Sequence, residues 1–142
     1  MTRVVDLANP ALGEAAHEFE GYRYGDAGVS FIVIDVPPGG GPELHRHPYG
    51  EIFVVQEGSV TFTAGDEVIE AGGGQVVVVP AGVPHRFVNS GAGRLRQVDI
   101  HASERFITEW LEEYPGAGNG TGTRRPCPGA SRQTSSMGEE TR

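Results

Sequence analysis

Short alternations of apolar and polar residues dominate the chain before residue 102. Five short segments are rich in β-branched or aromatic residues and are bounded by Gly, Pro or Asn: 31–36, 52–56, 60–63, 76–79 and 86–88. Turn residues at 56–59 and 64–67 fit hairpins between neighbouring strands. Regular short strands with such turns are typical of a sandwich or barrel, so we predict an all-β fold.

The segment 76–79 consists of valines only. Successive side chains of a strand point to opposite faces, so we expect this strand to be covered both inside and outside. The outer cover would be the N-terminal segment or a second subunit. Residues 1–25 form an N-terminal arm, in which the aromatic alternation over 18–24 could supply an added strand.

After the strands, the pattern changes to a helical period over residues 103–114. Ser103 is a plausible N-cap, apolar residues recur at 106, 107, 110, 111 and 114, and Pro115 with Gly116 ends the segment. We predict a short C-terminal helix whose apolar stripe packs against the exterior of the barrel. From residue 115 to 142, 16 of 28 residues are Gly, Pro, Ser or Thr, which predicts a disordered tail.

Composition and charge narrow the classes of function. A chain of 142 residues can bury one core without disulfides, and the lone Cys127 forms no intramolecular bridge. The net charge is −8, and residues 1–114 hold 7 basic and 17 acidic groups, so nucleic acid is a poor partner. The absence of lysine excludes Schiff-base chemistry. No apolar run is long enough for a membrane span, so we expect a cytoplasmic protein with no membrane partner.

The chemistry of the chain is concentrated in two segments. His45 and His47 are two residues apart in an extended segment and therefore point the same way, and Glu51 keeps that parity if the chain returns to a strand after Pro48. The second segment adds His85. Imidazole nitrogens with one carboxylate suit a divalent transition metal. Four protein ligands leave open positions only on a five- or six-coordinate ion, which favours iron, manganese or nickel over zinc or copper.

The spacing of these residues matches two family motifs. The first contains Gly39, His45, His47, Glu51 and Gly58, and the second contains Gly74, Pro80, Gly82, His85 and Asn89. With every motif position present, the chain resembles the cupin superfamily, and in particular its small single-domain bacterial members of cupin type 2. The motifs and their connection run from residue 39 to 89.

The resemblance implies a single-domain jelly-roll barrel, here over residues 26–102, in which His45, His47, Glu51 and His85 coordinate the metal. The fifteen residues 59–73 then form the short connection of compact members. Many compact cupins pair through their outer sheets, so a homodimer is the expected state. Glu51 is either a permanent ligand or a general base, and we assign it first as a ligand and second as a catalytic candidate.

Other side chains are ambiguous between core and site. Strand parity places five residues inside the barrel, as core residues and as walls of a substrate pocket: Tyr49, Phe53, Val55, Phe62 and Phe87. Arg46 should face outward between two ligands. Asp99 and His101 would reach the cavity as acid–base candidates if their face were the inner one, but we interpret them as exposed edge residues.

Two classes of function follow from these residues. A third interpretation concerns only the role of the metal. The first is a metal-dependent enzyme acting on a small oxygenated molecule, with oxidoreductase or dioxygenase chemistry ahead of isomerase or cyclase chemistry. The alternative is a non-catalytic module that binds or senses a small molecule. In the third interpretation the metal only staples the fold, which predicts a closed coordination shell without an adjoining cavity.

Overall fold

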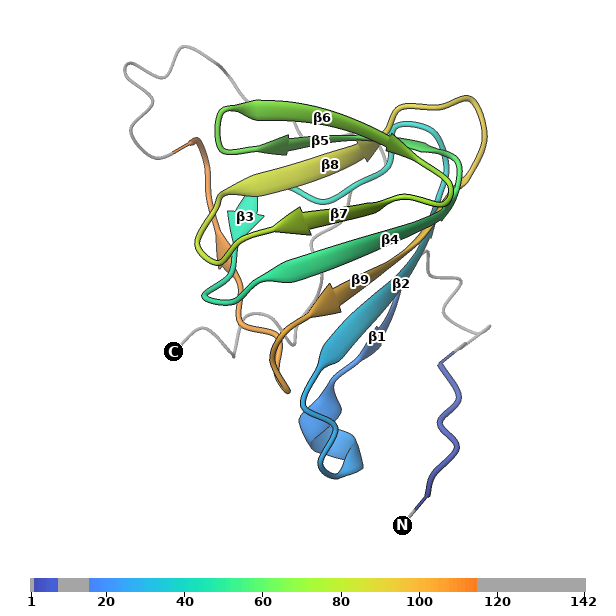
Figure 1. Cartoon of the computed structure of the whole chain (residues 1–142), viewed down its shortest axis with the longest axis vertical. Helices are drawn as coiled ribbons and strands as arrows, with labels where there is room; N and C mark the ends of the chain where they lie inside the picture. Colours follow the sequence, from blue (N-terminus) through green and yellow to red (C-terminus); the bar gives the residue numbers. More distant parts are fainter. Residues whose placement is uncertain (1, 8–15, 115–142) are drawn as a thin grey trace.

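The computed structural model describes residues 2–7 and 16–114, and these form an all-β fold of two five-stranded antiparallel sheets. One sheet has the order β1-β2-β9-β4-β7 and the other β10-β3-β8-β5-β6 (Figure 1). The strands are β1 (Ala16–Phe19), β2 (Ser30–Val36), β3 (His45–Arg46), β4 (Glu51–Glu57), β5 (Ser59–Ala64), β6 (Glu67–Gly72), β7 (Val76–Val79), β8 (His85–Asn89), β9 (Leu95–His101) and β10 (Glu109–Trp110). The prediction of an all-β jelly roll is confirmed.

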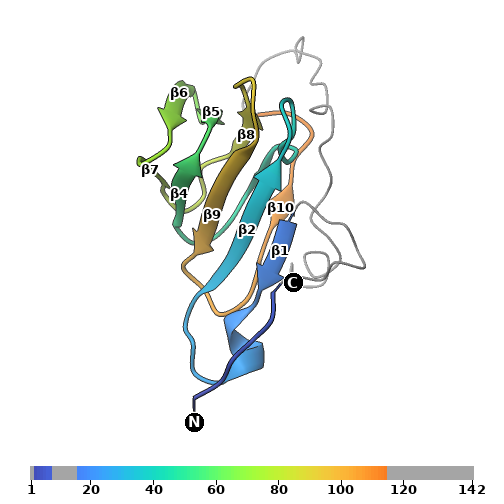
Figure 2. The ribbon, with the colours of Figure 1, turned by 90° about the vertical axis from the view of Figure 1, so that its right-hand side faces the viewer.

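Strand β1 of the N-terminal arm lies at one edge of the first sheet. Strand β1 pairs with β2 from Ala16 opposite Ile34 to Phe19 opposite Phe31, and a 3-10 helix, η1 (Gly21–Tyr24), follows it. Figure 2 shows β1, β2 and β9 side by side in one layer. None of the helices formed by the described residues has the length and hydropathy needed to cross a bilayer.

The core lies between the two sheets, where strand parity turns one row of side chains inward. Three phenylalanines fill its centre, Phe53 from β4, Phe62 from β5 and Phe87 from β8, each at most 2% exposed. Their ring centroids are 4.7 to 6.0 Å apart in tilted or edge-to-face arrangements. Such contacts add about 0.5–1.5 kcal/mol per pair to the burial of the rings themselves.

The N-terminal segment does not cover the outer face of β7 in the described part of the chain, and cover by a second subunit stays a prediction. Val77 and Val79 are buried, but the outward side chains of Val76 and Val78 are 55% and 64% exposed. The reason is topological, because β1 pairs with β2 at the opposite edge of the sheet from β7. The described part of the N-terminal arm therefore leaves the outer face of β7 open.

The predicted helix over 103–114 is also wrong. The segment is extended and ends in β10, which pairs with β3 in the register Glu109 opposite Arg46 and Trp110 opposite His45. Burial alternates along it, with Phe106 and Thr108 at most 1% exposed and Ile107 between them only partly buried. The open edge of β3 offers backbone partners that an isolated helix of this length cannot match. The tail from residue 115 to 142, with Cys127, lies outside the described residues.

Candidate metal centre

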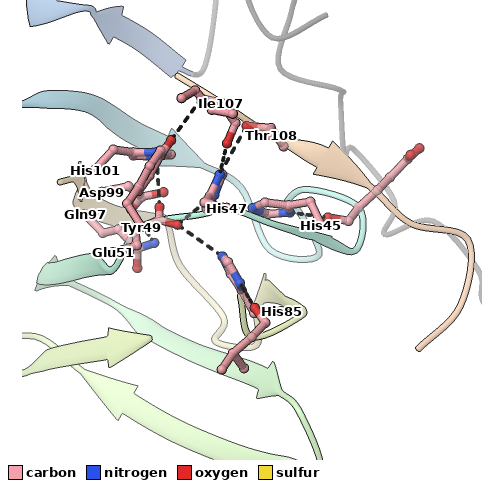
Figure 3. Close-up of polar contacts among 12 residues, drawn as sticks. His45, His47, Tyr49, Glu51, His85, Gln97, Asp99, His101, Ile107 and Thr108 are labelled. Carbon is pink, nitrogen blue, oxygen red and sulfur yellow. Dashed lines mark hydrogen bonds and ion pairs between the residues drawn. The ribbon is translucent and has the colours of Figure 1, made fainter. Parts of the chain in front are cut away.

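Three strands and the loop between β3 and β4 bring the four predicted ligands to one end of the barrel interior. His45 lies on β3 directly opposite His85 on β8, and Glu51 begins β4. One donor atom from each of His45, His47, Glu51 and His85 lies within 4.8 Å of every other. All four residues are at most 5% exposed, and Figure 3 shows their side chains gathered at one place. Distant parts of the sequence thus converge on one buried point.

The hydrogen bonds behind the three imidazoles determine which ring nitrogen faces that point. Each Nδ1 lies near a backbone carbonyl oxygen. The distance is 2.7 Å from His45 to Glu43, 2.9 Å from His47 to Ile107, and 2.8 Å from His85 to Val83. A carbonyl oxygen only accepts, so each Nδ1 carries the proton and donates it. The neutral ring then has its lone pair on Nε2, as metal-binding histidines require.

Burial keeps these groups in the forms that bind a cation. Burial lowers the pKa of His45 well below its ordinary value, and the neighbouring His85 and His47 lower it further. Burial likewise lowers the pKa of His47. Burial alone would raise the pKa of Glu51, but the nearby imidazoles of His101 and His47 outweigh it and hold that pKa well below the ordinary range. The site therefore combines the neutral imidazoles of His45 and His47 with an ionised carboxylate.

The donor set fits a metal ion. Glu51 Oε1 lies 3.0 Å from His47 Nε2 and 3.1 Å from His85 Nε2. With the protons on Nδ1, these contacts place nitrogen lone pairs against a carboxylate oxygen, and His47 Nε2 is buried without a hydrogen-bond partner. Such an arrangement is unfavourable unless a cation lies between the acceptors. A divalent transition metal satisfies all four donor atoms at once.

The interpretation of Asp99 and His101 as exposed edge residues is wrong, since both are only 2% exposed. They lie on the inward face of β9, where His101 is opposite Glu51 and its Nε2 is 3.0 Å from Glu51 Oε2. Burial, followed by the charge of Glu51, raises the pKa of Asp99 well above its ordinary value, against a 2.9 Å hydrogen bond from Gln97. The apolar neighbours Val98 and Ile100 misled the sequence interpretation, because they face outward.

The segment between β9 and β10, residues 102–108, forms a strap that reaches the site. The sequence interpretation did not place this segment at the site. Ile107 accepts from His47 Nδ1 through its carbonyl and donates its N–H to Tyr49 Oη at 3.2 Å. Thr108 Oγ1 lies 3.2 Å from His47 Nδ1. The ring of Phe106 meets that of His101 edge-on with centroids 4.9 Å apart. These contacts join the strap to the imidazoles. No local sequence pattern predicts them.

A cavity of about 450 Å³ adjoins the site on the strap side. It is lined by Arg46, His47, Pro48, Gly82, Ile107, Thr108 and Glu109, and Arg46 is paired there with Glu109 at 2.8 Å. Four predicted pocket residues lie in the core instead and are not part of this lining: Phe53, Val55, Phe62 and Phe87. Tyr49 is partly buried and stacks on the His47 ring with centroids 5.0 Å apart.

Comparisons with known proteins agree with this fold. A family model described as a cupin domain matches residues 32–101. Among solved structures, oxalate decarboxylase of Bacillus subtilis, from a study of its Mn(II) centres, is similar at 20% identity and a TM-score of 0.64, over 68% of this chain and 28% of that one. Oxalate decarboxylase of Lactobacillus farciminis, in a formate complex, gives 21% identity and a TM-score of 0.63, over 70% and 32%.

A smaller similar structure is an uncharacterised protein of Klebsiella pneumoniae with a double-stranded β-helix domain. It matches at 23% identity and a TM-score of 0.56, over 61% of this chain and 72% of that one. No curated protein matches the sequence. At these identities the likeness establishes the fold, and this chain spans about a third or less of each oxalate decarboxylase chain.

Proposed function

The chain belongs to the cupin superfamily, and from this membership we propose that it is a metal-dependent enzyme acting on a small oxygenated molecule. One observation carries the proposal. Three buried Nε2 lone pairs, fixed by backbone carbonyls, converge with the ionised carboxylate of Glu51 beside a cavity of about 450 Å³. A metal site that only stabilises the fold does not require an adjoining cavity of this size.

His45, His47, Glu51 and His85 would hold one divalent transition metal. Four protein donors leave a position for a substrate only at coordination numbers above four, which favours iron, manganese or nickel over zinc or copper. The Mn(II) centres of the Bacillus subtilis oxalate decarboxylase, a structure of the same fold, support manganese in that set. When bound, the ion supplies Lewis-acid or redox chemistry at a substrate oxygen.

The residues of the chain supply binding and orientation around that ion. The cavity reaches His47 and offers the Thr108 hydroxyl and the Arg46 guanidinium as polar groups among apolar ones. Glu51 has both oxygens engaged by imidazoles, Oε1 with His47 and His85 and Oε2 with His101. This engagement favours ligation over a free general base. Among reaction classes we place oxidoreductase or dioxygenase chemistry first, then isomerase or cyclase chemistry.

A non-catalytic binding or sensing module is the second candidate. It is favoured by the Arg46–Glu109 ion pair at the cavity, because that pair neutralises the two charged groups of the lining. Such a module would bind a small oxygenated ligand through the metal without turning it over. The difference between the two candidates is therefore turnover by metal-loaded protein.

The test begins with metal-free protein titrated calorimetrically with Mn²⁺, Fe²⁺, Ni²⁺ and Zn²⁺, and continues with a turnover screen of enols, flavonols, thiols and keto acids. We expect one ion per chain and metal-dependent turnover of a member of the screen. The variant His85→Ala should abolish both, whereas His17→Ala, which removes an imidazole on β1 outside the site, should change neither. Stoichiometric binding without any turnover would support the binding module instead.

A homodimer is the partner state we propose, formed through the outer face of the first sheet. The strand register aligns two rows across all five strands of this face, one of Val78, Ile52, Ile100, Phe31 and Phe19 and one of Val76, Val54, Val98, Val33 and His17. All members of these rows except His17 are apolar. Ile52, Val76 and Val78 are 40–64% exposed, and the other members are partly buried. A contiguous apolar face of this kind is typical of an interface.

The dimer is tested by sedimentation of the full chain. Val78→Lys places a charge on the proposed interface and should yield monomers. Val68→Lys changes a valine that is 69% exposed on β6 of the other sheet, and should leave the dimer intact. Wild-type protein that sediments as a monomer at every concentration would contradict the proposed interface.

A further inference from the structure

A fourth buried imidazole, His101, lies outside both sequence motifs and is 2% exposed. It belongs to a row of polar side chains on the inward face of β9, together with Gln97 and Asp99. Burying such a row is costly unless the groups have partners or a task. The partners of His101 are Glu51 on one side and Tyr49 on the other (Figure 3).

The partner behind His101 differs in kind from those behind the other three imidazoles. Its Nδ1 lies 2.7 Å from the hydroxyl of Tyr49, whereas Nδ1 of His45, His47 and His85 faces a backbone carbonyl. A hydroxyl can donate as well as accept, and a carbonyl can only accept. The hydroxyl oxygen of Tyr49 accepts the N–H of Ile107 at 3.2 Å and still has its own hydrogen to donate to His101 Nδ1. A proton on Nε2 of His101 would also face the ionised Oε2 of Glu51 at 3.0 Å, where a lone pair would be repelled. His101 then carries its proton on Nε2.

We propose that His101 is a positioning residue whose tautomer is fixed by Tyr49, and that it holds Oε2 of Glu51 so that only Oε1 is presented to the metal. The three motif histidines direct Nε2 lone pairs inward and accept the ion, while His101 directs an N–H inward and restrains the carboxylate. The two oxygens of Glu51 are divided accordingly, with His47 and His85 at 3.0 and 3.1 Å from Oε1 and His101 at 3.0 Å from Oε2.

The consequence lies in the coordination number. A carboxylate held at one oxygen occupies one position on the ion, whereas a released carboxylate can bind through both oxygens and occupy two. His101 would thereby keep one more position on the ion open to a substrate. The contact of His101 Nε2 with Glu51 Oε2 is close, at 3.0 Å, although its geometry is not that of a well-aligned hydrogen bond. This role in metal binding rests on the proposed function, whereas the tautomer does not.

The tautomers are measured first, on metal-free protein by ¹⁵N NMR of the imidazoles at a pH above the ordinary imidazole pKa. We expect protonated Nε2 in His101 and protonated Nδ1 in His45, His47 and His85. Tyr49→Phe should shift His101 toward the Nδ1-protonated form. Tyr24→Phe, which removes a phenol on η1 remote from the site, should leave all four rings unchanged. A proton on Nδ1 of His101 in wild-type protein would overturn the proposal.

The second measurement uses Mn²⁺ as the probe, by EPR and by titration. His101→Leu should change the zero-field splitting of the bound ion and weaken its binding by about 10–100-fold, the range found when groups that orient metal ligands are removed. His101→Gln retains an N–H donor and should restore the wild-type spectrum. An unchanged spectrum in His101→Leu would overturn the positioning role. Wild-type protein that binds no Mn²⁺ would contradict the proposed function, while the tautomers would still decide whether His101 differs from the other rings.

Discussion

The two ends of the barrel interior are equally buried and chemically opposite. Along β4 the inward side chains run from Glu51 to Phe53, which are 2% and 1% exposed. Along β8 they run from His85 to Phe87, which are 1% and 2% exposed. The same strands and the same face therefore build both the metal end and the aromatic end. Strand parity decides which residues are buried, and residue type alone decides what the burial does.

The energetic consequences of burial differ between the two ends. At the aromatic end, burying a phenylalanine side chain stabilises the fold by roughly 1.5–3 kcal/mol. At the metal end, burial lowers the pKa of His45 and His47, and lone pairs of His47 and His85 face a carboxylate. Burial at the metal end lowers the free energy of unfolding of the metal-free protein, and burial at the aromatic end offsets this loss. Variants at each end should therefore separate stability from metal binding.

The largest effect is expected at the aromatic end. Phe62→Ala removes a ring that is 0% exposed and contacts Phe53 and Phe87. It should lower the free energy of unfolding by about 3–5 kcal/mol, because a cavity remains where the ring was. Chemical denaturation measures the loss. A loss below about 1 kcal/mol, typical of a tolerated volume-conserving swap, would show that this end is not the packed core described here.

At the metal end, Glu51→Gln should act in the opposite sense. The variant should bind Mn²⁺ more than about 100-fold more weakly, exceeding the loss for groups that only orient ligands. Its amide N–H can donate to the Nε2 lone pairs of His47 or His85, so the metal-free protein should be at least as stable as wild type. Calorimetric titration and denaturation of the same sample give both values. Retained affinity would remove Glu51 from the ligand set.

The pH dependence of stability distinguishes the ends further. In the folded chain the pKa of His45 lies well below its ordinary value of 6.5, which the unfolded chain recovers. Below that value the unfolded chain binds more protons, so the free energy of unfolding should fall as pH decreases through it. Metal-free wild type should lose this stability relative to His45→Gln, which cannot titrate. Parallel pH profiles for the two proteins would contradict the buried neutral imidazole.

Asp99 gives a slope of the opposite sign. Burial, then the charge of Glu51, raises its pKa in the folded chain well above 3.8, so above that value the folded chain binds more protons than the unfolded one. Stability from this group is then lost as pH rises. Asp99→Asn keeps an oxygen for Gln97 and removes the slope, so its stability relative to wild type should increase with pH. A difference that stays constant with pH would place the Asp99 charge in solvent.

The sequence was sufficient for the barrel and for bringing the four candidate ligands together, because both follow from strand parity and motif spacing. Val60, Phe62, His85 and Phe87 alternate strictly with outward residues, and the structure places them inside. Parity is a local property of a single strand. The inward residues can therefore be predicted without knowing which strands are its neighbours.

The remaining features depend on pairing between distant segments. The segment 103–114 has a helical period but forms no helix, because its end pairs with the open edge of β3, where Trp110 lies opposite His45. His101 faces inward because β9 pairs with β4 so that it lies opposite Glu51. Neither edge availability nor this register is written in the local pattern, and the apolar neighbours of His101 indicated the wrong face. Polar residues that face a barrel interior are the ones that such patterns misplace.

The most direct test of the account is a crystal structure of protein loaded with Mn²⁺, with anomalous scattering used to locate the ion. The account predicts one ion bound by Nε2 of His45, His47 and His85 and by Oε1 of Glu51, with ligand distances of about 2.0–2.3 Å. An ion located elsewhere, an Nδ1 ligand from any of the three histidines, or no ion in protein soaked with excess Mn²⁺ would contradict it.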